Sequence, residues 1–382
     1  MAVLPWVLWG AVVFWALAVL NALLNTLLIP RLPRQGPEGA GLPSLTVVIP
    51  ARNEEGAIAR TVEAFCTQDY PGLSVVVVDD GSTDGTPEIL AGLAARFPNL
   101  TVVRGEEPPP GWLGKPHAQF LGLSRARSQW ILFADADVRY GPGVLRRAVG
   151  EALRRRLDFL LILSRLEARG LEHVLMANLD AFTFYVAPVF LANVQALRGF
   201  AFGAGSGNLV RLESLRKAGG LEAIRSEVVD DVAMGKAVKA SGARWGFLTA
   251  FGDVRVRMYD GLASAMEGFT KNFFAFFNYR PLWAAFLMAG DLGVHTLPPL
   301  VFLLGLLLPL PEPAFLPATL GTAAGLALNG ALCLWARKPL WTAPLYPLRP
   351  LLWTLVLLRS ARRYYRQGVV WRGRRYGRKP PR

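Results

Sequence analysis

The sequence is poor in the residues that build metal centres and covalent cross-links. Its 382 residues include two cysteines and three histidines. The two cysteines are Cys66 and Cys333, and the second stands within an apolar run, which excludes a disulfide framework and a cysteine metal site. The chain also lacks an internal repeat, so a solenoid or a propeller is excluded as well.

Acidic residues are outnumbered, with 28 Asp and Glu against 42 Lys and Arg and a net charge of +14. Ten of the basic residues and no acidic residue stand in residues 359–382, among aromatic residues and directly after apolar segments. Basic and aromatic residues beside membrane segments are typical of an anchor on anionic lipid. We therefore expect a membrane partner and no nucleic acid.

The chain begins with an apolar run that no basic residue precedes. Met1–Pro30 contains no charged side chain, and a helix of this length would cross a hydrocarbon core of about 30 Å. A cleaved signal peptide would need a basic start and a small-residue cleavage site, and neither is present. We predict an uncleaved transmembrane helix in residues 1–30.

Apolar runs return late in the chain, and mean hydropathy is positive at +0.31. Leu292–Pro311 and Pro313–Ala336 carry no charge and predict two transmembrane helices within residues 285–336. Pro339–Leu358 contains four prolines and Arg349, so it is typical of a re-entrant or interfacial segment. It opens a last region, 337–382, that ends in the basic tail.

Charge next to the apolar runs predicts the topology. Arg31, Arg34, the pair Arg337 and Lys338, and the tail should all be cytoplasmic. We expect a multi-pass protein of the cell (inner) membrane whose central domain and C-terminal tail lie in the cytoplasm.

A domain of globular composition, 44–258, follows a Pro- and Gly-rich linker, 31–43. Its apolar runs at 45–49, 73–78, 100–103 and 130–133 alternate with helical patterns. This alternation predicts an α/β fold with a mostly parallel sheet covered on both faces. Ligands of such sheets bind at the carboxyl ends of the strands.

Polar clusters stand at those strand ends. Residues 50–55 and 79–86 follow the first two strands and are either turn chemistry or oxygens that bind a base and a ribose. Asp135-Ala136-Asp137 follows another strand and offers two carboxylates to Mg²⁺ or Mn²⁺, although a lone Asp-x-Asp is common in loops. Asp231 of Val228–Asp231 is either an acid at a helix start or a general base, and both readings can hold together.

In this order and spacing, from Leu45 to about Trp245, the clusters resemble the inverting GT-A glycosyltransferases of family two. The resemblance implies the GT-A nucleotide-diphospho-sugar transferase fold. It also implies a UDP-sugar donor whose uridine is held by Pro50, Arg52, Asn53, Glu54, Asp79 and Asp80. Asp135 and Asp137 would handle the metal and the diphosphate, with Asp137 as the direct ligand, and Asp231 would be the base.

A narrower resemblance lies in Gly111–Ala118. It is similar to the Trp-x-Gly-Lys segment of membrane glycosyltransferases associated with hopanoids and carotenoids, the diaponeurosporenoate type, and the tail at 369–376 is similar to theirs. Lys115 would offset diphosphate charge, unless it is a surface lysine in a Gly/Pro loop. We place Trp112 and Asp230 on the acceptor side or at an interface.

Processive family-two synthases carry a Gln-x-x-Arg-Trp motif after the base, and this chain has none. The corresponding segment, 259–284, is rich in aromatic residues and predicts an interfacial helix. Lys271, Phe273 and Phe277 would then also guide an apolar acceptor. Gly203–Asn208 is not a dinucleotide motif and is expected to be a loop near the acceptor.

The sequence thus predicts a non-processive, inverting transfer of a hexose from a UDP-sugar to a lipid acceptor of carotenoid or hopanoid type. Glucose is the default hexose by resemblance. One alternative is a polyprenyl-phosphate or other glycolipid sugar transferase, for which Lys271 and Arg280 would suit an acceptor phosphate. The other is a non-catalytic nucleotide-sugar-binding membrane protein, which would have no need of a base.

Overall fold

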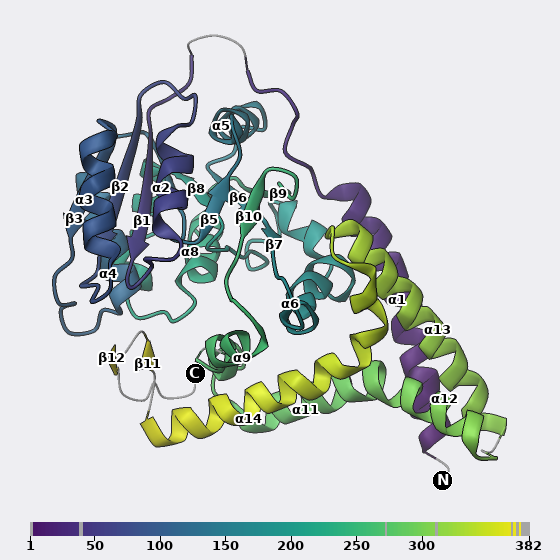
Figure 1. Cartoon of the computed structure of the whole chain (residues 1–382). Helices are drawn as coiled ribbons and strands as arrows, with labels where there is room; N and C mark the ends of the chain where they lie inside the picture. The colour runs from purple at the N-terminus through teal and green to yellow at the C-terminus, as the bar shows by residue number, and fades with distance from the viewer. Residues whose placement is uncertain are drawn as a thin grey trace. The chain divides into compact units, whose positions relative to one another are not determined.

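The computed structural model describes residues 3–37, 41–271, 273–309, 312–367, 370–371 and 374–375. The chain divides into two compact units (Figure 1). One comprises Ile29–Leu166 and Phe190–Arg257, and we call it the sheet unit. The other, which we call the helical unit, comprises Met1–Leu28, Glu167–Val189 and Met258–Arg382.

A seven-stranded sheet forms the centre of the sheet unit, in the order β3-β2-β1-β4-β8-β6-β9. Neighbouring strands are parallel except that β8 runs antiparallel to both β4 and β6. The strands are β1 (Leu45–Ala51), β2 (Leu73–Asp79), β3 (Leu100–Arg104), β4 (Trp130–Phe133), β6 (Phe159–Leu163), β8 (Asn208–Arg211) and β9 (Trp245–Thr249). The predicted strands are therefore present, and the mostly parallel sheet is confirmed.

Helices cover both faces of this sheet because its strands are apolar on both sides. They are α2 (Ile58–Cys66), α3 (Thr86–Arg96), α4 (Gly114–Arg125), α5 (Val144–Arg154), α7 (Leu212–Lys217) and α8 (Asp230–Ala240). Val47 and Val75 belong to the cluster that includes α2, α3 and α5, whereas Val76 and Val78 pack against Ala118 of α4. This period of two follows from the alternation of side chains along a strand.

A second, three-stranded sheet orders β5 (Val138–Tyr140), β10 (Val254–Val256) and β7 (Arg165–Leu166). Two residues of the predicted linker are hydrogen-bonded to other parts of this unit: Leu32 N donates to Thr249 O at 2.8 Å, and Arg147 Nη1 donates to Pro33 O at 3.2 Å. Residues 38–40 of that linker lie outside the described residues.

The helical unit contains α1, a segment between the two parts of the sheet unit, and the chain that follows the sheet unit. Its elements are α1 (Leu4–Leu28), α6 (Glu172–Ala181), η1 (Phe182–Val186), α9 (Leu262–Thr270), α10 (Phe273–Phe276), α11 (Pro281–Asp291), η4 (Leu292–Thr296), α12 (Leu297–Leu307), α13 (Glu312–Trp335), η5 (Leu340–Leu348), α14 (Arg349–Gln367), β11 (Val370–Trp371) and β12 (Arg374–Arg375). Of the predicted tail motif at 369–376, residues 369, 372, 373 and 376 lie outside the described residues.

Within the described residues, three helical stretches are long and apolar enough to cross a membrane: Leu4–Leu28, Pro281–Leu307 and Pro313–Trp335. The second begins before residue 285, where we expected the first late span to start, because α11, η4 and α12 continue one another. The proline-rich stretch is not among the candidate spans and forms η5 and the start of α14.

A buried arginine holds this turn of the helical unit. Arg349 at the start of α14 is 2% exposed, and its Nη2 donates to Asn329 Oδ1 at 2.6 Å and to Tyr185 Oη at 3.0 Å. Nearby in the sequence, Lys338 pairs with Asp180 at 2.6 Å. Arg349, which interrupts the apolar run in the sequence, is thus accommodated by polar partners inside the unit.

Candidate functional site

The first two polar clusters lie side by side, because β1 and β2 are parallel neighbours and Ala51 pairs with Asp79. Asn53 adopts a left-handed φ of 54°, and its Oδ1 accepts from Thr83 N at 2.8 Å. Asp79 Oδ1 accepts from Ser82 N at 3.0 Å. These contacts fold the two loops onto each other, so the turn chemistry and a common binding edge occur together.

Arg52 and Asp80 join the same edge. Arg52 Nη1 donates to Asp80 O at 2.5 Å and lies 4.0 Å from the Asp80 carboxylate, which is buried. Pro50 pairs with Val78 in the strand register. Each predicted nucleotide-binding residue therefore belongs to one contiguous edge of the sheet, and their contact with a uridine stays a prediction.

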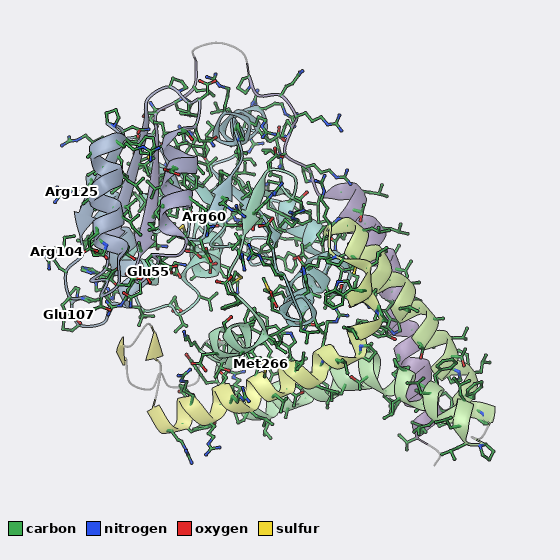
Figure 2. All side chains as sticks on the ribbon, viewed as in Figure 1. Glu55, Arg60, Arg104, Glu107, Arg125 and Met266 are labelled. Carbon is green, nitrogen blue, oxygen red and sulfur yellow. The ribbon has the colours of Figure 1, made fainter. Side chains whose placement is uncertain are left out.

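Glu54 and Glu55 open the segment before α2. Glu54 N donates to Thr86 Oγ1 at 2.9 Å, and Glu55 Oε2 accepts from Gly85 N at 2.8 Å (Figure 2). The two glutamates have different surroundings, since the Glu54 charge acts on Asp137 and raises its pKa. Glu54 thus belongs electrostatically to the carboxylates of the predicted metal site as well as to the nucleotide edge.

Lys115 connects the predicted diphosphate and base clusters. It lies in the first turn of α4, and its Nζ is 2.8 Å from Asp135 Oδ1 and 3.3 Å from Asp230 Oδ1. Burial disfavours its charge, but Asp135, Asp230 and Asp231 outweigh that effect and hold the Lys115 pKa well above its usual range. Lys115 is therefore a partly buried ammonium among carboxylates and not a fully exposed surface residue.

Asp137 has the surroundings of a metal ligand. Among the described residues, its Oδ1 is buried without a hydrogen-bond partner. Burial, together with the Asp135 and Glu54 carboxylates, raises the pKa of Asp137 to about 8. A hard divalent cation with oxygen ligands would satisfy the orphaned oxygen and relieve this repulsion, so the residues present fit Mg²⁺ or Mn²⁺.

The protein offers only part of a coordination shell. Within the described part of the chain, no three Asp, Glu, His or Cys side chains converge as a metal site would require. Mg²⁺ typically keeps waters and takes further oxygens from substrate phosphates. The two-carboxylate arrangement therefore suits a cation that arrives with a diphosphate.

Asp231 stands near the start of α8, as the sequence suggested. Its Oδ1 accepts from Val232 N at 2.8 Å, and its main-chain oxygen accepts from Asn208 Nδ2 at 3.2 Å. Burial raises the pKa of Asp231 to about 7, Lys115 opposes the rise, and Asp230 adds to it. A carboxylate with a pKa near neutrality is well suited to act as a general base.

The glycine-rich loop at 203–208 packs tightly against this cluster. A side chain at Gly205 would overlap the Asp135 carboxylate, and one at Gly203 would overlap the Asp231 carbonyl oxygen. Asp135 N also donates to Gly205 O at 2.8 Å. The backbone of this loop therefore comes close to both the diphosphate and base clusters, and its expected place near the acceptor stays a prediction.

Two residues of the site were missed by sequence reasoning. Gln119 is 3% exposed, and its Nε2 donates to Asp230 Oδ2 at 2.9 Å. Its position four residues after Lys115, on the same helix face, was the available signal. Asn208 was noted only as the end of the glycine loop. Its hydrogen bond to the Asp231 main-chain oxygen depends on the antiparallel strand β8, which the pattern did not predict.

The Trp112 segment is tied to the base loop through the main chain. Leu113 N donates to Arg225 O at 2.8 Å. The Trp112 ring lies 5.1 Å from the Phe120 ring and 5.8 Å from the His117 ring, centroid to centroid. Trp112, which precedes α4, thus packs against the side of that helix, and its acceptor role stays a prediction.

The remaining predicted residues belong to the helical unit. Phe273 lies 4.4 Å from the Trp353 ring, centroid to centroid, and Phe277 is 4% exposed. Lys271 directly follows α9. The two aromatic side chains pack within their own unit, and their predicted part in guiding an acceptor stays a prediction.

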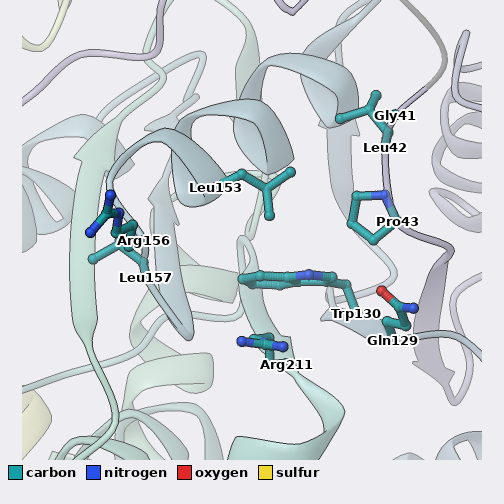
Figure 3. Close-up of a pocket in the computed structure, with 9 residues that line it drawn as sticks. All are labelled: Gly41, Leu42, Pro43, Gln129, Trp130, Leu153, Arg156, Leu157 and Arg211. Atoms are coloured by element: carbon teal, nitrogen blue, oxygen red, sulfur yellow. The ribbon is translucent and has the colours of Figure 1, made fainter.

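A cavity of about 570 Å³ lies at the other end of the strands (Figure 3). Trp130 at the start of β4 lines it together with Leu153 and Arg211, whereas Asp135 follows the end of that strand. The cavity is therefore separate from the carboxylate cluster.

Comparison with known proteins agrees with this geometry. Residues 46–217 match the model of the family described as glycosyl transferase family 2. The 4,4'-diaponeurosporenoate glycosyltransferase of Staphylococcus aureus (strain MRSA252) is 30% identical over 237 residues, 60% of this chain and 60% of that protein. The chain thus matches less than two thirds of the length of that relative.

Among solved structures, the mannosyltransferase PcManGT from Pyrobaculum calidifontis in complex with GDP-Man and Mn²⁺ has a TM-score of 0.55. It is 20% identical in sequence, and the alignment covers 93% of this chain and 99% of that one. The predicted GT-A fold is confirmed.

Proposed function

We propose that this chain transfers a hexose from a UDP-sugar to a lipid acceptor. The proposal starts from the match of residues 46–217 to glycosyl transferase family 2. The transfer is inverting and adds one sugar to each acceptor. One observation carries the proposal: Lys115 contacts Asp135 of the diphosphate cluster and Asp230 beside the base. A donor at one cluster is then within reach of a base at the other.

The reaction needs one proton transfer and one displacement. Asp231 takes the proton of the acceptor hydroxyl, and the hydroxyl oxygen attacks the anomeric carbon. The bond between that carbon and the diphosphate oxygen breaks on the opposite side, so UDP leaves and the configuration inverts. Asn208 and the Val232 amide orient Asp231 for this step.

Charge on the departing UDP is stabilised by this chain's own cation. Lys115 is the ammonium of the cluster, and it can pair with phosphate oxygens as it now pairs with carboxylates. Asp137 and Asp135 would hold Mg²⁺ or Mn²⁺, which when bound supplies neutralisation of the diphosphate. Gly205 leaves the space in which Asp135 lies.

The acceptor assignment follows from the apolar helices and from the relative. Within the described residues, three helical stretches are suited to span a membrane, and the S. aureus protein is named as a 4,4'-diaponeurosporenoate glycosyltransferase. A lipid of carotenoid or hopanoid type would present its polar end at the membrane surface. Positive residues next to the apolar helices favour a protein of the cell membrane whose sheet unit lies in the cytoplasm.

The test is transfer of radiolabelled hexose from several UDP-hexoses, with Mn²⁺, to a membrane lipid extract by protein in lipid nanodiscs. We expect label from UDP-glucose in the organic phase as a single-sugar product, with its anomeric configuration inverted relative to the donor. Label in a polymer, or a retained configuration, would contradict the proposed reaction. A product hydrolysed by mild acid, as polyprenyl-phosphate sugars are, would replace the proposed acceptor by an acceptor phosphate.

A further inference from the structure

The Lys115 ammonium contacts a carboxylate, Asp135, that a divalent metal ion would also bind. The ammonium lies 2.8 Å from Asp135 Oδ1, and Asp135 is one of the two carboxylates that suit a divalent ion. Opposite charges at this distance attract strongly when they are partly shielded from water. The side chain of Lys115 is shielded in this way, since it is 19% exposed. Lys115 therefore neutralises part of the metal site in the free protein.

The second contact of Lys115 is of another kind. Asp230 is 3% exposed and is held at both oxygens by α4, with Oδ1 3.3 Å from Lys115 Nζ and Oδ2 accepting from Gln119 Nε2 at 2.9 Å. Asp135, in contrast, has a side chain that is 37% exposed. Asp230 is thus a buried and fixed partner of the ammonium, whereas Asp135 is a partner that solvent can reach.

Gln119 is committed to this arrangement. Its Oε1 is buried and has no hydrogen-bond partner among the described residues, so the side chain pays a desolvation cost to donate to Asp230. Leu113 N also donates to Arg225 O, which joins the start of α4 to the loop before Asp230. These contacts make Asp230 a firm anchor for Lys115.

We propose that Lys115 is an exchangeable counter-ion, which holds Asp135 in the free protein and moves to the donor diphosphate when a divalent cation takes Asp135. Asp230, held by Gln119, is the pivot of this movement and is a positioning residue. The inference rests on the proposed function for the identity of the donor. The exchange between the two cations rests only on the geometry of this cluster.

The exchange predicts effects of opposite sign in one variant. Lys115→Met removes the competing ammonium, so Mn²⁺ alone should bind about tenfold more tightly. The same variant lacks the cation that meets the diphosphate, so UDP-glucose in saturating Mn²⁺ should bind about tenfold more weakly. A lysine that only supports the fold would weaken both ligands.

Binding is measured on the purified full-length protein without acceptor. Free Mn²⁺ is followed by electron paramagnetic resonance and UDP-glucose by calorimetry. Arg125→Met is the matched control, because it removes one exposed positive charge from the other end of α4 (Figure 2). It should leave both affinities within about twofold of the wild type, as surface charges are screened. Near-wild-type melting temperatures would show that the variants are folded.

Gln119→Met tests the pivot, because it removes the hydrogen bond to Asp230 and keeps Lys115. We expect weaker UDP-glucose binding in Mn²⁺ and unchanged binding of Mn²⁺ alone. Unchanged or weaker Mn²⁺ binding by folded Lys115→Met would overturn the exchange, as would unchanged donor binding. Absence of lipid glycosylation would instead count against the proposed function, since these titrations need no turnover.

Discussion

Asp137 makes metal binding depend on pH in a defined direction. Burial and the Asp135 and Glu54 carboxylates raise its pKa from 3.8 to about 8. A raised pKa means that the carboxyl is protonated below about pH 8, and a metal ion binds only the deprotonated form. Mn²⁺ must therefore displace a proton at neutral pH.

The size of the effect follows from this competition. Each pH unit below the pKa lowers the fraction of carboxylate about tenfold, so apparent Mn²⁺ affinity should fall roughly 50- to 100-fold from pH 8 to pH 6. Above pH 8 the affinity should level off. About one proton should be released for each Mn²⁺ bound at pH 6.5.

The assay is Mn²⁺ titration in the presence of UDP-glucose, whose diphosphate is a diester and does not titrate in this range. Calorimetry in buffers of different ionisation enthalpy counts the released protons. Asp137→Asn should bind Mn²⁺ weakly and with little pH dependence, whereas the exposed acid-to-amide control Glu213→Gln should behave as the wild type. If the Mn²⁺ affinity of the wild type were the same at pH 6 and pH 8, metal binding would not require deprotonation of an Asp137 with a raised pKa.

Three further predictions concern catalysis, the glycine loop and the helical unit. Because burial raises the pKa of Asp231 to about 7 and only its carboxylate accepts a proton, kcat at saturating donor and metal should fall about tenfold per pH unit below an apparent pKa of about 7; a rate that rises with acidity would contradict this. Gly205→Ala should displace Asp135 and weaken Mn²⁺-dependent donor binding at least tenfold, with Gly92→Ala on α3, where a side chain has open space, as the control. Trp353→Ala should destabilise the helical unit by about 3–5 kcal/mol, because a buried ring and its bond to Leu175 O are lost, and Trp353→Phe by less; unfolding in detergent measures both.

The parts of the fold that depend on local pattern were predictable. β1 to β4 are runs of apolar and β-branched residues separated by helical patterns, so their existence and their parallel pairing followed from the sequence. The strand β8 was not predicted, because Asn208–Arg211 is short and follows a glycine-rich loop. Its position between β4 and β6 depends on pairing over long sequence separations.

The candidate site shows the same division. The carboxylates could be named because they stand at strand ends, where α/β sheets bind ligands. The bond from Gln119 to Asp230 could not, because it joins residues that are 111 positions apart. Lys115 was noticed as a motif residue, but its two carboxylate partners, Asp135 after β4 and Asp230 at the start of α8, come together only in the folded chain.

The central claim is that Asp231 is the base of a sugar transfer to lipid. Its most direct test compares lipid-dependent UDP release by the wild type and by Asp231→Asn, with UDP-glucose, Mn²⁺ and a membrane lipid extract. We expect the variant to bind UDP-glucose within about threefold of the wild type and to release UDP about 10²- to 10⁴-fold more slowly. Release by the variant at the wild-type rate would mean that Asp231 is not the base.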